Sequence, residues 1–174
     1  MGNEEGEWVD MQILSDEQIR ALIEEPKPMP SGLEPLGAMS KRSQHYRKDF
    51  SFVCPTSGNE FIVIIRKSAI NMLDFSVILG YKPSYIHEVF RLRRYNGKSH
   101  HHSNVLERGP RFYDFHIHTA TERYQRQGGF EEDAFAEPTI RYQTIERAIQ
   151  CLLDDCGFRP QIDTSPLFTN QPIP

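Results

Sequence analysis

The sequence predicts an α+β fold in which a five-stranded antiparallel β-meander packs against a C-terminal helix, with a short helix before the sheet. Apolar and polar residues alternate with a period near two from His45 to His118, and turns rich in Gly, Pro, Asn and Ser interrupt the alternation. Apolar residues spaced three and four apart follow at 140–156 and also precede the strands. Because most connections are short, successive strands should pair as antiparallel neighbours.

Length and composition favour one cytoplasmic domain. The chain has 174 residues, 38% of them hydrophobic, which is enough for a single core. It lacks an apolar run long enough to span a membrane, so we expect no membrane association. Its three cysteines lack metal-knuckle or disulfide spacing, which favours a reducing cytoplasm. We expect an acidic segment with a short helix and proline-rich linker at 1–40, the domain at 41–158, and an extended proline-rich tail at 159–174.

Local signals place the first helix. Ser15 and Gln18 have the spacing of a capping box, in which each side chain bonds the backbone of the other. An apolar stripe follows, and prolines from Pro26 onward end the helix. In the segment before it, Trp8 is the one residue that we expect to dock on the domain.

The strands are expected at 45–54, 61–65, 73–81, 86–95 and 111–118. The run FIVII at 61–65 is apolar on both faces, so it belongs inside the sheet with a helix across its second face. Thr119 or Thr121 can begin a short helix that ends at Gln127. The helix at 140–156, followed by Gly157 as its C-cap, is the expected cover for the sheet.

Six of the seven histidines lie between residues 85 and 126, around the predicted long-looped hairpin. Asn96-Gly97 supplies the turn residues after its first strand. Side chains alternate faces along a strand, so we expect Tyr113, Phe115 and Ile117 to be buried. The polar faces of the two strands should then be neighbours, and they hold six residues: Arg91, Arg93, Tyr95, Asp114, His116 and His118.

Our principal functional hypothesis is that this hairpin face engages RNA or another phosphate-bearing ligand and cleaves it without a metal or cofactor. Cleavage through the 2′-hydroxyl needs a base, an acid and a cation, which His116, His118 and Arg93 could supply, with Glu122 as a further proton carrier. Arginines bind phosphate and aromatic rings stack on bases. The expected phosphate or nucleic-acid contacts are Arg91, Arg93, Arg94, Tyr95, His101 and Arg123.

Two other interpretations use the same residues. A metal-dependent hydrolase could bind its ion through Asp114, His116 and His118, with a third histidine from the run at 100–102. Alternatively the face is a non-catalytic interaction surface, on which Asp114 pairs across the strands with Arg91 or Arg93. The sequence lacks the phosphate-binding loop, GxSxG, HExxH and dinucleotide motifs, so the enzyme classes defined by them are not predicted.

The strings FRLRRYNGKSHHHSN (90–104) and FYDFHIHTATERYQ (112–125) resemble the central block of an uncharacterised bacterial protein family found near mobile elements and toxin–antitoxin genes. The resemblance covers about residues 45–157. It implies a bacterial cytoplasmic setting, a toxin or defence role and an antitoxin-like protein partner. It carries no assigned catalytic residues, and the neighbourhood part is analogy.

Overall fold

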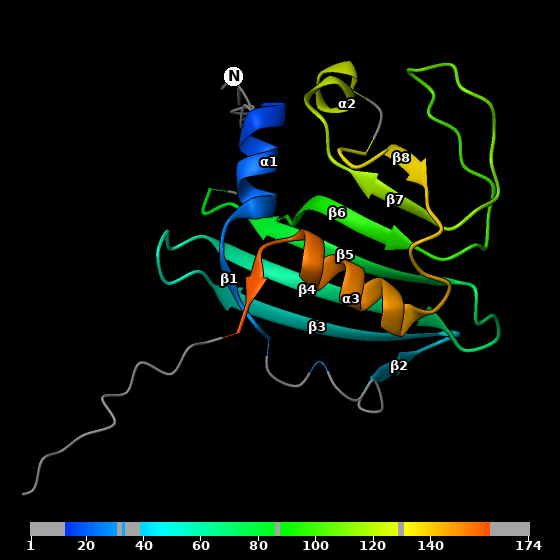
Figure 1. Ribbon diagram of the computed structural model, residues 1–174, viewed down its shortest axis with the longest axis horizontal. Coiled ribbons are helices and arrows are strands. Elements are labelled where there is room, and N and C mark those ends of the chain that lie inside the picture. The colour runs from blue at the N-terminus through cyan, green and yellow to red at the C-terminus, as the bar shows by residue number, and fades with distance from the viewer. Residues whose placement is uncertain (1–12, 31–32, 34–38, 86–87, 129–130, 161–174) are drawn as a thin grey trace, which may run out of the picture.

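A computed structural model describes residues 13–30, 33, 39–85, 88–128 and 131–160 (Figure 1). The expectations for Trp8 and for most of the proline-rich tail fall outside these ranges. None of the helices in the described ranges is long and apolar enough to cross a membrane.

Seven strands form one antiparallel sheet whose spatial order follows the chain. The predicted α+β class and meander are confirmed, but the expected strand count of five is wrong because a short strand is added at each edge. The strands are β2 (Ser40–Arg42), β3 (His45–Val53), β4 (Glu60–Ser68), β5 (Phe75–Lys82), β6 (Phe90–Asn96), β7 (His116–Thr119) and β8 (Phe135–Pro138).

The two edge strands were missed because each is too short to show a period of its own. β2 lies at the end of the expected linker, and β8 follows the acidic residues after the second helix. A separate two-stranded parallel sheet joins β1 (Lys27–Pro28) to β9 (Phe158–Arg159), which brings the expected linker and the beginning of the expected tail together.

Three helices accompany the sheet: α1 (Asp16–Glu24), α2 (Glu122–Gln127) and α3 (Ile145–Asp155). The predicted capping box of Ser15 and Gln18 is present in both directions, and Thr121 is the N-cap of α2. α3 begins five residues later than expected because Thr144 accepts a hydrogen bond from the Arg147 backbone and caps it there.

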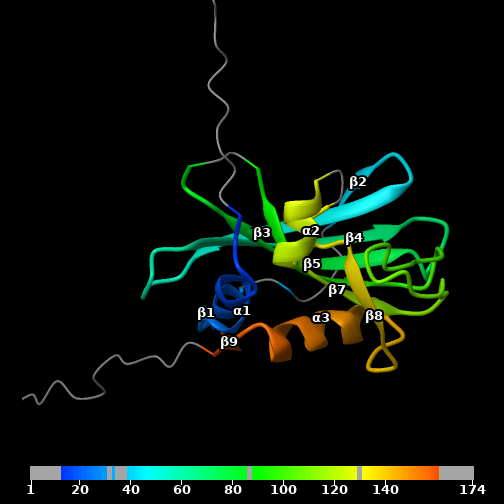
Figure 2. The same ribbon diagram turned by 90° about the horizontal axis from the view of Figure 1, so that it is seen from above.

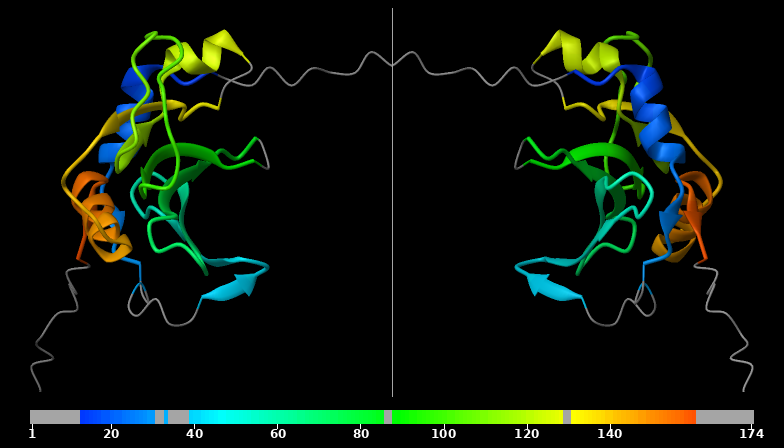
Figure 3. Two further views of the ribbon diagram at one scale, coloured as in Figure 1. Left: turned by 90° about the vertical axis from the view of Figure 1, so that its right-hand side faces the viewer. Right: turned by 90° about the vertical axis from the view of Figure 1, so that its left-hand side faces the viewer.

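The sheet is curved, and α1 and α3 lie on one side of it (Figures 2 and 3). Alternation along β4 explains the double apolar face of FIVII. Phe61, Val63 and Ile65 join the main core with residues of α1 and α3. Ile62 and Ile64 pack with Ile78 in a smaller cluster on the opposite face, which we call the inner face of the sheet. The expected helix cover of the sheet is therefore present on the main-core side.

A bulge in β6 changes which side chains share a face. The register between β5 and β6 shifts where Leu79 pairs with Arg93 and Gly80 pairs with Arg91, which leaves Leu92 as the extra residue. Leu92 and Tyr95 are both fully buried in the main core. The expectation that Tyr95 lies on the polar face with Arg91 is therefore wrong, because the alternation from Phe90 does not continue through the bulge.

The second hairpin strand is shorter than expected. β7 contains four residues, and the preceding segment from 97 to 115 is a loop apart from one isolated bridge between His102 and Phe112. Ile117 is buried and Phe115 is partly buried, but Tyr113 is 42% exposed, so the expected burial of Tyr113 is wrong. Within 111–115, Phe112 packs against His102 of the loop, whereas Phe115 packs against the main core.

A candidate metal centre

Strands β6 and β7 bring polar side chains together on the inner face. Asn96 is the direct cross-strand partner of His116, and Arg94 is the partner of His118. Because positions two apart on a strand point to the same side, both imidazoles lie on one face. They are nonetheless buried, with exposures of 0% and 2%. The expectation that His116 and His118 share a face is confirmed, and that face is buried at both positions.

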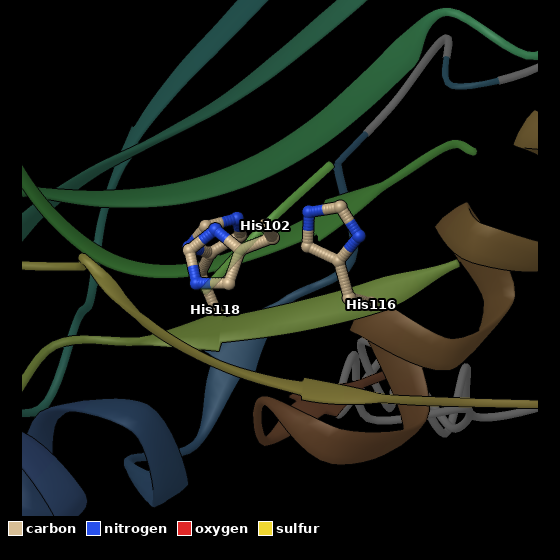
Figure 4. A group of neighbouring side chains, drawn as sticks. All are labelled: His102, His116 and His118. Atoms are coloured by element: carbon tan, nitrogen blue, oxygen red, sulfur yellow. The ribbon is translucent and has the colours of Figure 1, made fainter. Parts of the chain in front are cut away.

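The loop between the strands supplies the third imidazole. The backbones of His102 and Phe112 exchange two hydrogen bonds of 2.9 Å, which folds the loop back over β7. Asn104 fixes the loop against β8, because its side chain donates to the Ala136 carbonyl and accepts from the Ala136 N–H. This pair of bonds holds His102 beside the two strand histidines (Figure 4).

The three imidazoles have the spacing of a metal site. One ring nitrogen from each of His102, His116 and His118 lies within 4.8 Å of the other two. The ring centroids are 4.8, 4.9 and 5.4 Å apart. A tetrahedral ion bound at about 2.0–2.1 Å from each nitrogen would separate the ring centroids by roughly 5 Å. Such an ion would hold the three nitrogens roughly 3.4 Å apart, so nitrogens near the 4.8 Å limit would have to move closer together to share it.

Hydrogen bonds to oxygen define the tautomer of each ring. His116 Nδ1 lies 2.7 Å from the Asp114 carbonyl, and His118 Nδ1 lies 2.7 Å from the Asp133 carbonyl. A carbonyl only accepts, so Nδ1 of His116 carries the proton. His118 Nδ1 also lies 3.3 Å from Arg94 Nη2, which can only donate, but the carbonyl contact is much shorter. The shorter contact assigns the proton of His118 to Nδ1, which leaves the lone pair on Nε2 of both strand histidines. His102 Nε2 lies 3.1 Å from Asn104 Oδ1, which likewise places its proton on Nε2.

This pattern is typical of metal-binding histidines. Such residues donate their second ring N–H to a carbonyl or carboxylate, which fixes the tautomer and the orientation of the ring. Here the nitrogens left with lone pairs are Nδ1 of His102 and Nε2 of His116 and His118.

Burial keeps the three imidazoles neutral. It lowers the pKa of His116 to about 4, and burial followed by the nearby Arg94 charge lowers the pKa of His118 to about 2. The pKa of His102 is also lowered, mainly by burial, although the Asn104 side chain and the Ala134 carbonyl oppose the shift. Metal ligands must be neutral imidazoles, so these histidines are in the binding form at pH 7 without first losing a proton.

Asn96 faces the same lone pairs from the neighbouring strand. Its Nδ2 lies 3.4 Å from His116 Nε2 and 3.3 Å from His118 Nε2, so one amide group serves both rings through long hydrogen bonds. Its Oδ1 is buried and has no partner. A polar cluster that leaves a buried acceptor unpaired costs free energy, which favours a role for it beyond structural support.

An ion cluster lies behind His118. Arg94 Nε is 3.0 Å from the Asp133 carboxylate, and Arg91 Nε is 3.5 Å from it. Arg91 also pairs with Glu131 and Glu132. Burial raises the pKa of Asp133, and the Arg94 and Arg91 charges oppose that effect. Arg91 is thus engaged by the protein's own acidic segment.

Several predicted site residues lie elsewhere. Arg93 lies beside Asp155 of α3, on the main-core side of the sheet. Tyr95 donates to Asp155 and is buried, so it offers no ring to a base. Glu122 is on α2 and pairs with Arg126. The expected grouping of Arg93, Tyr95 and Glu122 with the histidine pair is wrong.

Three more predicted contacts are also separate from the centre. Arg123 pairs with Glu107, and the exposed His101 packs against Tyr113. Asp114 is 52% exposed and lies 3.5 Å from Lys98. Its carboxylate is therefore neither a ligand nor a cross-strand partner of Arg91, although its backbone carbonyl orients His116.

Sequence analysis did not identify Asn96, Asn104 or the Asp133 carbonyl as parts of this centre. Asn96 was assigned only to a turn, whereas it is the last residue of β6 and pairs with His116. Asn104 and Asp133 act through contacts more than ten residues away along the chain, to Ala136 and His118. The available signal was the histidine run, which pointed to the loop without selecting His102.

Comparison of the chain with protein families, curated proteins and solved structures finds no match. The resemblance to an uncharacterised bacterial family, with its implied toxin role and protein partner, therefore stays a prediction.

Proposed function

We propose that the protein is a metal-dependent hydrolase whose ion is held by His102, His116 and His118. The observation that carries the proposal is the convergence of three neutral imidazoles, each with one ring nitrogen hydrogen-bonded to an oxygen. A purely structural cluster of histidines does not require a ring nitrogen of each residue to lie within 4.8 Å of the other two.

The chemistry of the ligand set favours Zn²⁺, although imidazole also suits Cu, Fe and Ni. Three histidine ligands carry no charge, so the ion keeps its full positive charge. Catalytic zinc sites characteristically have three protein ligands and lower the pKa of a bound water to about 7. Asn96, the remaining polar side chain beside the two Nε2 atoms, would orient the group that occupies the fourth position.

The same geometry gives less support to metal-independent cleavage by a histidine acid and base. That mechanism needs one imidazole protonated near neutral pH. Burial lowers the pKa of both His116 and His118 far below 7. The phosphate-directed part of the earlier hypothesis is kept as a proposal about the substrate.

The hydrolase proposal predicts zinc-dependent turnover. Zinc-loaded full chain should hydrolyse at least one of p-nitrophenyl acetate, p-nitrophenyl phosphate and bis(p-nitrophenyl) phosphate. Chelation should abolish the activity and Zn²⁺ should restore it. His118→Asn should lower the rate by about two to four orders of magnitude, because the ion loses a ligand and with it the activated water. Activity that persists after complete chelation would contradict the proposal.

A further inference from the structure

A polar pocket of about 140 Å³ lies on the inner face where β4, β5 and β6 end beside one another. Its walls include Arg66 from β4, Ser76 from β5, and Arg94 and Asn96 from β6. His100 completes the wall toward the three imidazoles, with its ring 5.3 Å from that of His116. The pocket therefore adjoins the candidate metal centre through Asn96 and His100.

The charges around the pocket are mainly positive. Arg66, Lys67 and Arg94 line it, and Asp74 is the single carboxylate among its lining residues. That carboxylate lies 3.6 Å from His45, which also lines the pocket. Within the described ranges, the Arg66 side chain makes no hydrogen bond or ion pair. Arg66 and Arg94 thus bring two guanidinium groups to one pocket. Burial lowers the pKa of Arg94, and the Arg66 charge acts in the same direction.

We infer that this pocket binds the phosphoryl group of the substrate between Arg66 and Arg94. The volume suits a group of that size rather than a whole nucleotide. Arg94 Nε lies against Asp133 and its Nη2 against His118, so Arg66 offers the paired donors that match phosphate oxygens. An anion between the two guanidinium groups would be attracted by both charges. The identity of the substrate rests on the proposed function, whereas the anion site rests on the pocket alone.

Asn96 links the two sites. In the structure its Nδ2 faces the imidazole lone pairs, while its Oδ1 has no partner. Half a turn of the amide exchanges these atoms. Oδ1 would then face a cation held by the imidazoles, and an N–H would become available to an anion in the adjoining pocket. Metal and phosphate should therefore each strengthen the binding of the other.

The test is calorimetric titration of the full chain with inorganic phosphate, first without metal and then with Zn²⁺. Metal-free protein should bind phosphate. Arg66→Gln should weaken binding about ten- to a hundredfold, as expected for the loss of charge-assisted hydrogen bonds. Arg147→Gln is the matched control, because this arginine is exposed on α3 on the opposite side of the sheet. Zn²⁺ should tighten binding in the unaltered protein and less so in Asn96→Leu.

Competition identifies the source of the phosphoryl group. Displacement of phosphate by AMP points to a phosphate monoester, and displacement by single-stranded RNA points to the nucleic-acid backbone. Either result supports the anion site. Equal phosphate affinity in Arg66→Gln and the unaltered protein, or no binding at about 10 mM phosphate, overturns it. Because the first titration uses metal-free protein, it tests the anion site even if the protein proves not to bind a metal.

Discussion

Zinc should raise the free energy of unfolding by about 4 kcal/mol when its free concentration is about a thousand times its dissociation constant. The folded chain holds one ring nitrogen from each of three neutral imidazoles within 4.8 Å of the other two. An unfolded chain would have to order the loop that carries His102 and the segment that carries His116 and His118 to do so. Urea unfolding of chelated and zinc-loaded protein measures the difference. The midpoint should move while the slope stays unchanged.

Variants separate the centre from nonspecific zinc binding. His118→Asn should lose most of the stabilisation, because its ring is fixed on β7 by the Asp133 carbonyl. His101→Asn should keep it, since His101 lies one residue from His102 but packs against Tyr113. Equal stabilisation of both variants by zinc would show that the ion binds elsewhere.

Metal-free protein should lose stability as the pH falls below about 6.5. The pKa of His116 is about 4 and that of His118 about 2 in the folded protein, against 6.5 for an unperturbed imidazole. The unfolded chain therefore binds protons first, and the free energy of unfolding decreases by up to about 1.4 kcal/mol per pH unit for each residue. From pH 6.5 to 5 the two histidines together should cost up to about 4 kcal/mol.

Urea unfolding at pH 7.0, 6.0 and 5.0 measures this dependence. His118→Asn should flatten the slope, because one of the buried histidines that take up a proton on unfolding is absent. His101→Asn should leave the slope as it is in the unaltered protein. A free energy of unfolding that is constant over this range would mean that the strand histidines are not buried in neutral form.

Much of the fold could be predicted from local patterns. The period of two at 45–81 and the capping box at Ser15 specify structure through neighbouring residues, and both are present. The bulge at Leu92 could not be predicted, because a single inserted residue is fixed by its register against Leu79 and Gly80 on another strand. That insertion moved Tyr95 to the core.

The candidate centre was predictable to the level of residue type. The spacing of His116 and His118 placed two imidazoles on one strand face, and the run at 100–102 offered a third. Which of these three histidines joins them depends on Asn104 bonding Ala136, a contact across 32 residues. Asp114 seemed a natural ligand by alternation, but it precedes the strand and its side chain turns to Lys98.

The central claim, that three histidines form one metal centre, is tested most directly by metal content. Full chain purified without chelator should contain about one equivalent of zinc or another divalent transition metal, measured by inductively coupled plasma mass spectrometry. His101→Asn should contain the same amount of metal as the unaltered protein. His116→Asn should contain less than about a tenth of that amount, given the losses expected for an altered metal site, while its secondary structure is unchanged. A metal-free protein that also fails to take up added Zn²⁺, or full metal content in His116→Asn, would contradict the account.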